Sequence, residues 1–90
     1  MYTLETTKHF LRQSGKFFKK HPELRPRFED IVEALRHDPF QPSLKLHQLG
    51  GKLADLHAIS LTHSYRITLT LQITEKEIIL IDIGSHDEVY

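Results

Sequence analysis

The sequence has no cysteine and no long hydrophobic run, and both absences narrow the class of protein. Without cysteine, disulfide scaffolds, thiolate metal sites and cysteine nucleophiles are excluded. No apolar segment approaches the ~20 residues that a membrane-spanning helix needs. The first five residues also lack the basic-then-apolar layout of a signal peptide. We therefore expect a cytoplasmic protein without a membrane partner, built as a single domain over residues 1–90.

The chain also has no net charge, with 12 Lys and Arg against 12 Asp and Glu. These charges are unevenly distributed along the sequence. Residues 1–27 hold seven basic and two acidic residues, and residues 45–66 hold three basic residues and one acidic residue. Because a nucleic acid binds to a basic face rather than to a basic total, neutrality leaves nucleic-acid binding open.

Several common catalytic and nucleotide-binding motifs are missing. There is no GxSxG, no P-loop and no GxGxxG, so acyl hydrolysis and nucleotide binding through the usual loops have no support. Seven histidines are present, but none forms an HxxxH pair or a cluster with metal-ligand spacing. We therefore expect no metal site and no cofactor.

The first half of the chain predicts a short strand followed by a helical hairpin. Tyr2 and Leu4 alternate with polar residues, which favours a strand. A first helix begins after Thr6 or Thr7, with one face that comprises Phe10, Leu11, Ser14, Phe17 and Phe18. A second helix begins near Pro22 or Pro26 and ends before Pro39, with an apolar face that comprises Leu24, Phe28, Ile31, Val32 and Leu35.

The second half predicts strands at residues 44–49, 56–61, 65–73 and 78–83. In the third of these, alternation places Tyr65 and Ile67 on an apolar face and Arg66 on the opposite one. The last is almost entirely apolar, which predicts a central strand buried on both faces. The expected fold class is α+β, with a three- to four-stranded antiparallel sheet packed against the helices and one face partly open.

A set of basic, imidazole and phenol side chains accompanies these strands, namely Lys45, His47, Lys52, Arg66, His86 and Tyr90. They suit RNA cleavage by the ribose 2′-hydroxyl, which needs a general base, a general acid and a cation on the phosphoryl oxygens. The alternative is a sheet surface with ordinary polar residues. We interpret the other histidines as surface residues (His9, His21, His37) or as structural residues (His57, His63).

Three short motifs add a resemblance. Residues 46–53 (LHQLGGKL) look like an "L-x-G" segment after a helical hairpin, residues 63–67 (HSYRI) like an "x-Y-R-I/V" strand, and residues 83–90 (IGSHDEVY) like an "I-G-x-H-x-x-V/L-Y" ending. With the order of the elements, they make the whole chain resemble the RelE/ParE superfamily of bacterial toxins. The similarity is greatest to its RelE-like, ribosome-dependent mRNA endonucleases of the YafQ type.

The resemblance implies roles for the singled-out residues. Arg66 takes a phosphate-binding position, His86 a general acid or base position, and Tyr90 a C-terminal aromatic position. His47 matches a histidine that precedes the "L-x-G" turn, and Lys45 and Lys52 would contact RNA or ribosomal RNA. The structural alternative for Arg66 is a cross-strand pair with an acid such as Asp82.

The resemblance also implies a function and partners. The chain would be the toxin of a type II toxin-antitoxin system, an mRNA interferase that cuts mRNA in the 30S A site and inhibits translation. A cognate antitoxin would neutralise it in a toxin-antitoxin hetero-oligomer. One alternative is a ParE-like toxin that binds a protein such as DNA gyrase and cleaves nothing, and another is an antitoxin-binding protein that has lost its toxicity.

Overall fold

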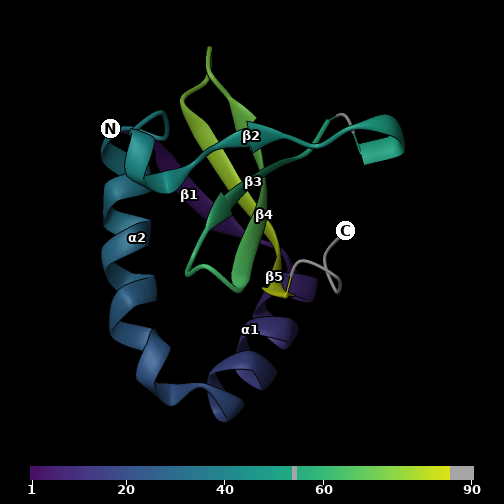
Figure 1. Ribbon diagram of the computed structural model, residues 1–90. Helices are drawn as coiled ribbons and strands as arrows, with labels where there is room; N and C mark the ends of the chain where they lie inside the picture. Colours follow the sequence, from purple (N-terminus) through teal and green to yellow (C-terminus); the bar gives the residue numbers. More distant parts are fainter. Residues whose placement is uncertain (54, 86–90) are drawn as a thin grey trace.

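The chain folds into one sheet and two helices, and the computed structural model describes residues 1–53 and 55–85 (Figure 1). The elements are β1 (Thr3–Thr6), α1 (Lys8–Lys20), α2 (Arg25–His37), β2 (His47–Gln48), β3 (His57–Ser60), β4 (Tyr65–Gln72) and β5 (Glu77–Ser85). Short 3-10 turns lie at Pro22–Leu24 (η1), Pro42–Leu44 (η2) and Gly51–Leu53 (η3). In the described ranges, neither helix is long and apolar enough to cross a membrane.

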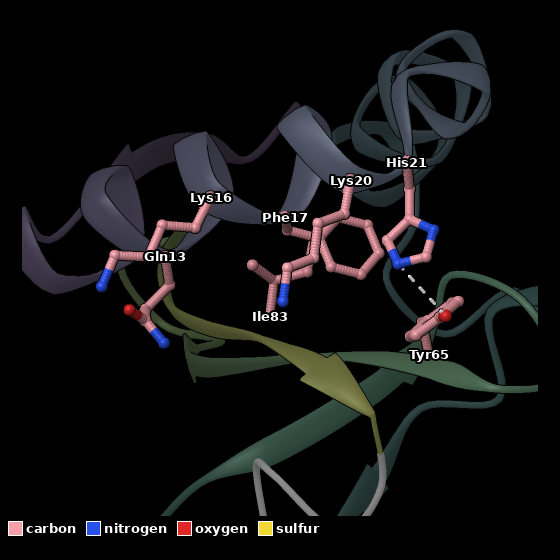
Figure 2. Close-up of a pocket in the computed structure, with 7 residues that line it drawn as sticks. All are labelled: Gln13, Lys16, Phe17, Lys20, His21, Tyr65 and Ile83. Atoms are coloured by element: carbon pink, nitrogen blue, oxygen red, sulfur yellow. Dashed lines mark hydrogen bonds between the residues drawn. The ribbon is translucent and has the colours of Figure 1, made fainter.

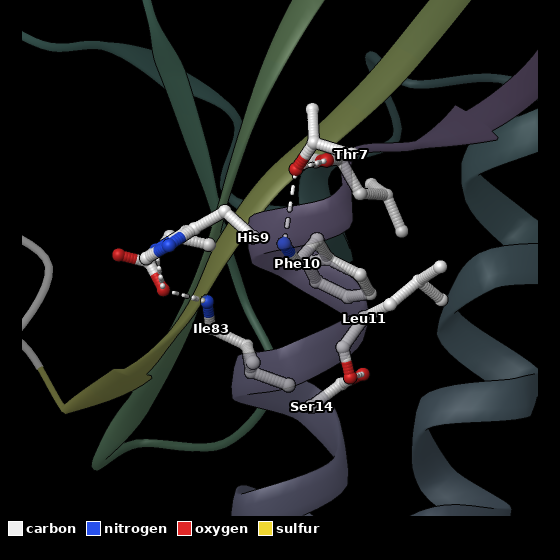
Figure 3. A network of polar contacts seen from close by, with 8 residues as sticks. Thr7, His9, Phe10, Leu11, Ser14 and Ile83 are labelled. Atoms are coloured by element: carbon white, nitrogen blue, oxygen red, sulfur yellow. Dashed lines mark hydrogen bonds and ion pairs between the residues drawn. The ribbon is translucent and has the colours of Figure 1, made fainter.

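The helices begin where the sequence predicts. The Thr7 hydroxyl oxygen accepts a hydrogen bond from the Phe10 amide at 2.9 Å and so caps α1 (Figure 3). The same hydroxyl donates to the Leu80 carbonyl at 3.3 Å, which fastens the cap to β5. Pro22 opens the η1 turn and Pro26 lies in the first turn of α2, where its missing amide hydrogen costs nothing.

One face of each helix packs against the sheet and forms the core. Phe10, Phe17, Phe18 and Leu35 are at most 8% exposed, and they join the inward side chains of β3, β4 and β5. The expectation that Leu11 shares this face is wrong, since Leu11 is 59% exposed. Successive helical residues are turned by roughly 100°, so Leu11 lies off the side that Phe10 turns to the sheet.

The sheet has five strands in the order β1-β5-β4-β3-β2. The α+β class is confirmed, but the sheet is mixed, because β1 joins its edge parallel to β5 while the other pairs are antiparallel. The first strand expected in the second half shrinks to His47–Gln48. Leu44 belongs to η2, and Lys45 adopts a left-handed conformation with φ 54° that interrupts an extended backbone.

A β-bulge interrupts the pairing of β4 with β5. Thr68 stands opposite Asp82, whereas the next residue, Leu69, stands opposite Leu80, so β5 carries one extra residue, Ile81. The bulge corrects the expectation of a strand buried evenly on both faces. Leu80 is fully buried in the core cluster, while Ile81 and Asp82 are only partly buried.

We predict that Thr7→Ala lowers the free energy of unfolding by about 1–2 kcal/mol, because it removes the helix cap and the bond to β5. Urea unfolding followed by circular dichroism measures the loss. Thr7→Ser keeps the hydroxyl and should retain most of the stability, and Thr74→Ala, in the exposed β4–β5 turn, is the matched control. An effect of Thr7→Ala no larger than that of Thr74→Ala contradicts this role of the cap.

Candidate functional site

Arg66 lies in the middle of a cross-strand row of residues on β3, β4 and β5. It stands opposite Ser60 on β3 and opposite Gly84 on β5. Residues that pair across a sheet project to the same side. Gly84 has no side chain, so in this row β5 places no side chain beside the half-buried Arg66. The row therefore places Arg66 between a serine and a glycine.

The expected alternative, an ion pair between Arg66 and Asp82, does not form. Asp82 stands opposite Thr68, and its Oδ1 lies 3.4 Å from Nε2 of His9 on α1. Within residues 1–53 and 55–85, Arg66 forms no ion pair with an acidic side chain. Its charge is therefore not neutralised by a carboxylate of the described chain.

Arg66 lines a pocket of about 290 Å³ at the margin of the sheet, together with Arg27, Ser43, Lys45, Ser60, Thr62 and His63. Arg27, Lys45 and Arg66 bring three basic side chains to the pocket, and no acidic side chain of residues 1–53 and 55–85 belongs to the lining. Hydroxyl groups from Ser60 and Thr62 add hydrogen-bond donors. Such a set suits an oxyanion such as a phosphate, since an arginine guanidinium can bind two of its oxygens at once.

Arg27 is a member of this site that the sequence did not single out. Its Nε donates a hydrogen bond to the Leu61 carbonyl in the β3–β4 loop, which holds the guanidinium at the pocket. The only signal in the sequence is that Arg27 closes the basic segment of residues 1–27. Its position depends on how α2 packs beside the loop, which periodicity does not reveal.

His47 lies on the same face of the sheet as Arg66. It pairs with Ala58, which pairs in turn with Thr68, two residues along β4 from Arg66. Two residues of strand span about 7 Å. His47 Nδ1 lies 3.0 Å from the Lys45 carbonyl, and because a carbonyl only accepts, Nδ1 carries a hydrogen in this contact. In the neutral ring the lone pair is then on Nε2, the arrangement that a general base needs.

The other expected site residues are not brought into this pocket. Lys52 is exposed in η3, in a loop that extends away from the sheet beyond β2 and β3 (Figure 1), and it does not line the pocket. His86 and Tyr90 lie outside the described residues, which end at Ser85 with β5.

Two of the remaining histidines differ from expectation. His63, expected as a structural residue, is exposed in the β3–β4 turn and lines the pocket. His21, expected as a solvated surface residue, has only 28% of its side chain exposed and lies 3.3 Å from the Tyr65 hydroxyl. Across residues 1–53 and 55–85, no three His, Asp or Glu side chains are grouped closely enough to hold a metal ion.

No family model and no curated protein sequence matches the chain, but solved structures do. A metal-bound toxin from Helicobacter pylori is 27% identical, with a TM-score of 0.82 and full coverage of both chains. E. coli YafQ is 13% identical, with a TM-score of 0.81, and the match covers 100% of this chain and 99% of YafQ. The structure of the E. coli DinJ-YafQ complex matches with a TM-score of 0.80.

A toxin from Agrobacterium tumefaciens, described as YoeB/ParE, is 16% identical with a TM-score of 0.75 and covers 93% of this chain and 98% of its own. These structures are toxins of the RelE, YafQ and YoeB/ParE types. The chain therefore has the RelE-like fold of the RelE/ParE toxins, as the resemblance of its sequence motifs implied.

Proposed function

We propose that the chain is the toxin of a type II toxin-antitoxin system, an endoribonuclease that cuts mRNA in the 30S A site and thereby inhibits translation in the cytoplasm. The observation that carries this proposal is the cationic pocket around Arg66. Three basic side chains line it, from α2, from the segment before β2 and from β4, and no acidic side chain of the part of the chain that the structure describes shares the lining. A backbone phosphate of RNA fits the charge and hydrogen-bonding groups of this pocket.

In the proposed reaction, the ribose 2′-hydroxyl attacks the adjacent phosphorus atom and the 5′-oxygen leaves. Arg66, supported by Arg27, stabilises the charge on the phosphoryl oxygens. His47 and His86 serve as general base and general acid, in an assignment that the resemblance leaves open. Tyr90 stacks on a base or donates a hydrogen bond, and Lys45 and Lys52 contact the backbone of the message or of ribosomal RNA.

A cognate antitoxin is the second proposed partner. Support comes from the complexes of DinJ with YafQ among the structures that share this fold. A toxin that arrests translation must be held inactive during growth, and a peptide laid over the cationic pocket would do this. We expect the two chains to form a hetero-oligomer.

Arg66→Lys should lower the rate of mRNA cleavage on translating ribosomes by about 10²-fold, because lysine keeps the charge but loses the two-pronged contact with phosphoryl oxygens. Primer extension on a message in a reconstituted translation reaction measures the rate. The control is Arg12→Lys, on the exposed surface of α1 outside the pocket. A rate for Arg66→Lys equal to that of the control contradicts the role of Arg66.

His86→Ala should lose most of the cleavage in the same assay, because the reaction would lack one of its two proton-transfer groups. The matched control is His37→Ala, since His37 is exposed on α2 and its side chain bonds to Glu33 on its own helix. Undiminished cleavage by the His86→Ala protein refutes its assignment.

The ParE-like alternative remains relevant because one structure with this fold is described as YoeB/ParE. We predict that excess protein leaves DNA supercoiling by gyrase unchanged, since the proposed reaction takes place on RNA and needs no protein target. A supercoiling assay decides between the two functions. Inhibition of gyrase by a protein that leaves ribosome-bound message intact would favour the alternative.

A further inference from the structure

A second cationic pocket, of about 210 Å³, lies between the C-terminal half of α1 and the adjoining ends of β4 and β5 (Figure 2). Its lining consists of Gln13, Lys16, Phe17, Lys20, His21, Tyr65 and Ile83. Figure 2 shows Lys16 and Lys20 reaching from α1 toward the strands below. As in the pocket around Arg66, no acidic side chain of the described residues belongs to the lining. The proposed reaction uses none of these residues.

The aromatic side of this pocket is held rigidly. The Tyr65 and Phe17 rings are arranged edge to face, with centroids 5.0 Å apart and an interplanar angle of 82°. It also lies 4.9 Å from the His21 ring, and the Tyr65 hydroxyl is 3.3 Å from His21 Nε2. His21 Nδ1 is in turn 3.7 Å from Glu23 Oε2, so this acid lies on the side of the imidazole away from Tyr65. Tyr65 therefore offers a fixed phenol surface at one end of the pocket, which Lys16 and Lys20 line from α1.

The two cationic pockets share one corner of the sheet. Tyr65 lines one and Arg66 lines the other, and as consecutive strand residues they project to opposite faces. Their partners on β5, Ser85 and Gly84, are also consecutive. A flexible ligand with repeated negative charges can therefore pass over this corner and engage both pockets, whereas a single small anion can fill only one.

We propose that the pocket between α1 and the β4–β5 end is a second RNA subsite, in which Lys16 and Lys20 bind a phosphodiester that flanks the one held at Arg66. The identity of the ligand rests on the proposed function. The apolar and aromatic floor of Phe17 and Tyr65 accepts the ribose or base of that nucleotide, since lysines beside aromatic rings are the usual means of binding single-stranded nucleic acid. The phosphodiester belongs either to the message or to ribosomal RNA.

An acidic peptide fits this pocket less well. Peptides commonly bind by adding a strand to a free sheet edge, but β5 is paired on both sides, with β1 and with β4. The pocket therefore offers cations and rings but no open backbone edge.

The test compares the double variant Lys16→Gln/Lys20→Gln with the control Arg12→Gln/Lys19→Gln, which removes the same charge from exposed positions of the same helix outside the pocket. A third variant, Lys16→Arg/Lys20→Arg, keeps the charge. The probe is a fluorescent single-stranded RNA with every ribose 2′-O-methylated, which blocks cleavage. Anisotropy gives its affinity over a series of salt concentrations, and circular dichroism confirms that all variants fold.

We expect Lys16→Gln/Lys20→Gln to bind the probe about tenfold more weakly than the control. We also expect the slope of log affinity against log salt to fall by roughly 0.7 for each lost phosphate contact. The arginine variant should bind like the wild type. Co-sedimentation with ribosomes, with and without message, shows whether the phosphodiester belongs to the message or to ribosomal RNA. If it belongs to ribosomal RNA, Lys16→Gln/Lys20→Gln weakens binding to message-free ribosomes as well.

Equal affinities and slopes for the glutamine variant and the control, both for the probe and for ribosomes, overturn the proposal. The proposal is also overturned if the wild-type protein binds neither the RNA probe nor ribosomes. An oligoglutamate peptide serves as a second probe. If Lys16→Gln/Lys20→Gln weakens binding of this peptide but not of RNA, the proposal is overturned in favour of an acidic peptide ligand. The proposed function fails separately, since a protein that cuts no message but needs Lys16 and Lys20 for RNA binding contradicts only the cleavage reaction.

Discussion

The β-bulge between β4 and β5 is the constraint on which both the core and the candidate site depend. The extra residue, Ile81, shifts the rest of β5 by one position against β4. Without it, Ile83 would stand opposite Arg66, and the acidic residue before it would stand opposite Ile67 in the core. With it, Ile83 pairs with Ile67 in the buried cluster and Gly84 comes to face Arg66. One irregularity thus keeps a carboxylate out of the core and an isoleucine side chain away from the guanidinium.

The same end of the sheet is also where the helices are anchored. Phe17 and His21, at the end of α1, pack on Tyr65 at the start of β4, and Arg27 of α2 bonds to the loop that precedes it. These contacts bring the basic segment of residues 1–27 against the strand that carries Arg66. The packing that closes the hydrophobic core therefore also gathers the cations, and a variant that loosens this corner would disturb stability and anion binding together.

The sequence predicted those features that follow from local pattern. Strand alternation placed Arg66 off the apolar face, and the motifs around it led to the correct fold. Features that depend on tertiary contacts were missed, including Arg27 at the pocket and the exposure of His63 within its lining. Lys45 lines the pocket, whereas Lys52 lies in η3 outside it. This difference depends on the paths of the loops, which the composition of the sequence does not specify. The bulge was missed because a run of isoleucine and leucine gives no signal for the extra residue.

A neutral chain can present such a surface because, within residues 1–53 and 55–85, the two acids nearest to it are engaged by histidines. Asp82, the acid closest in sequence to Gly84 among the described residues, lies against His9 on α1, and Glu23 lies against His21 on the side away from Tyr65. Ionic screening at physiological salt limits the effect of distant charges to about 8 Å. Among the described residues, the charges that line the two pockets are those of lysines and arginines, so the zero net charge of the chain does not by itself argue against binding of a polyanion there.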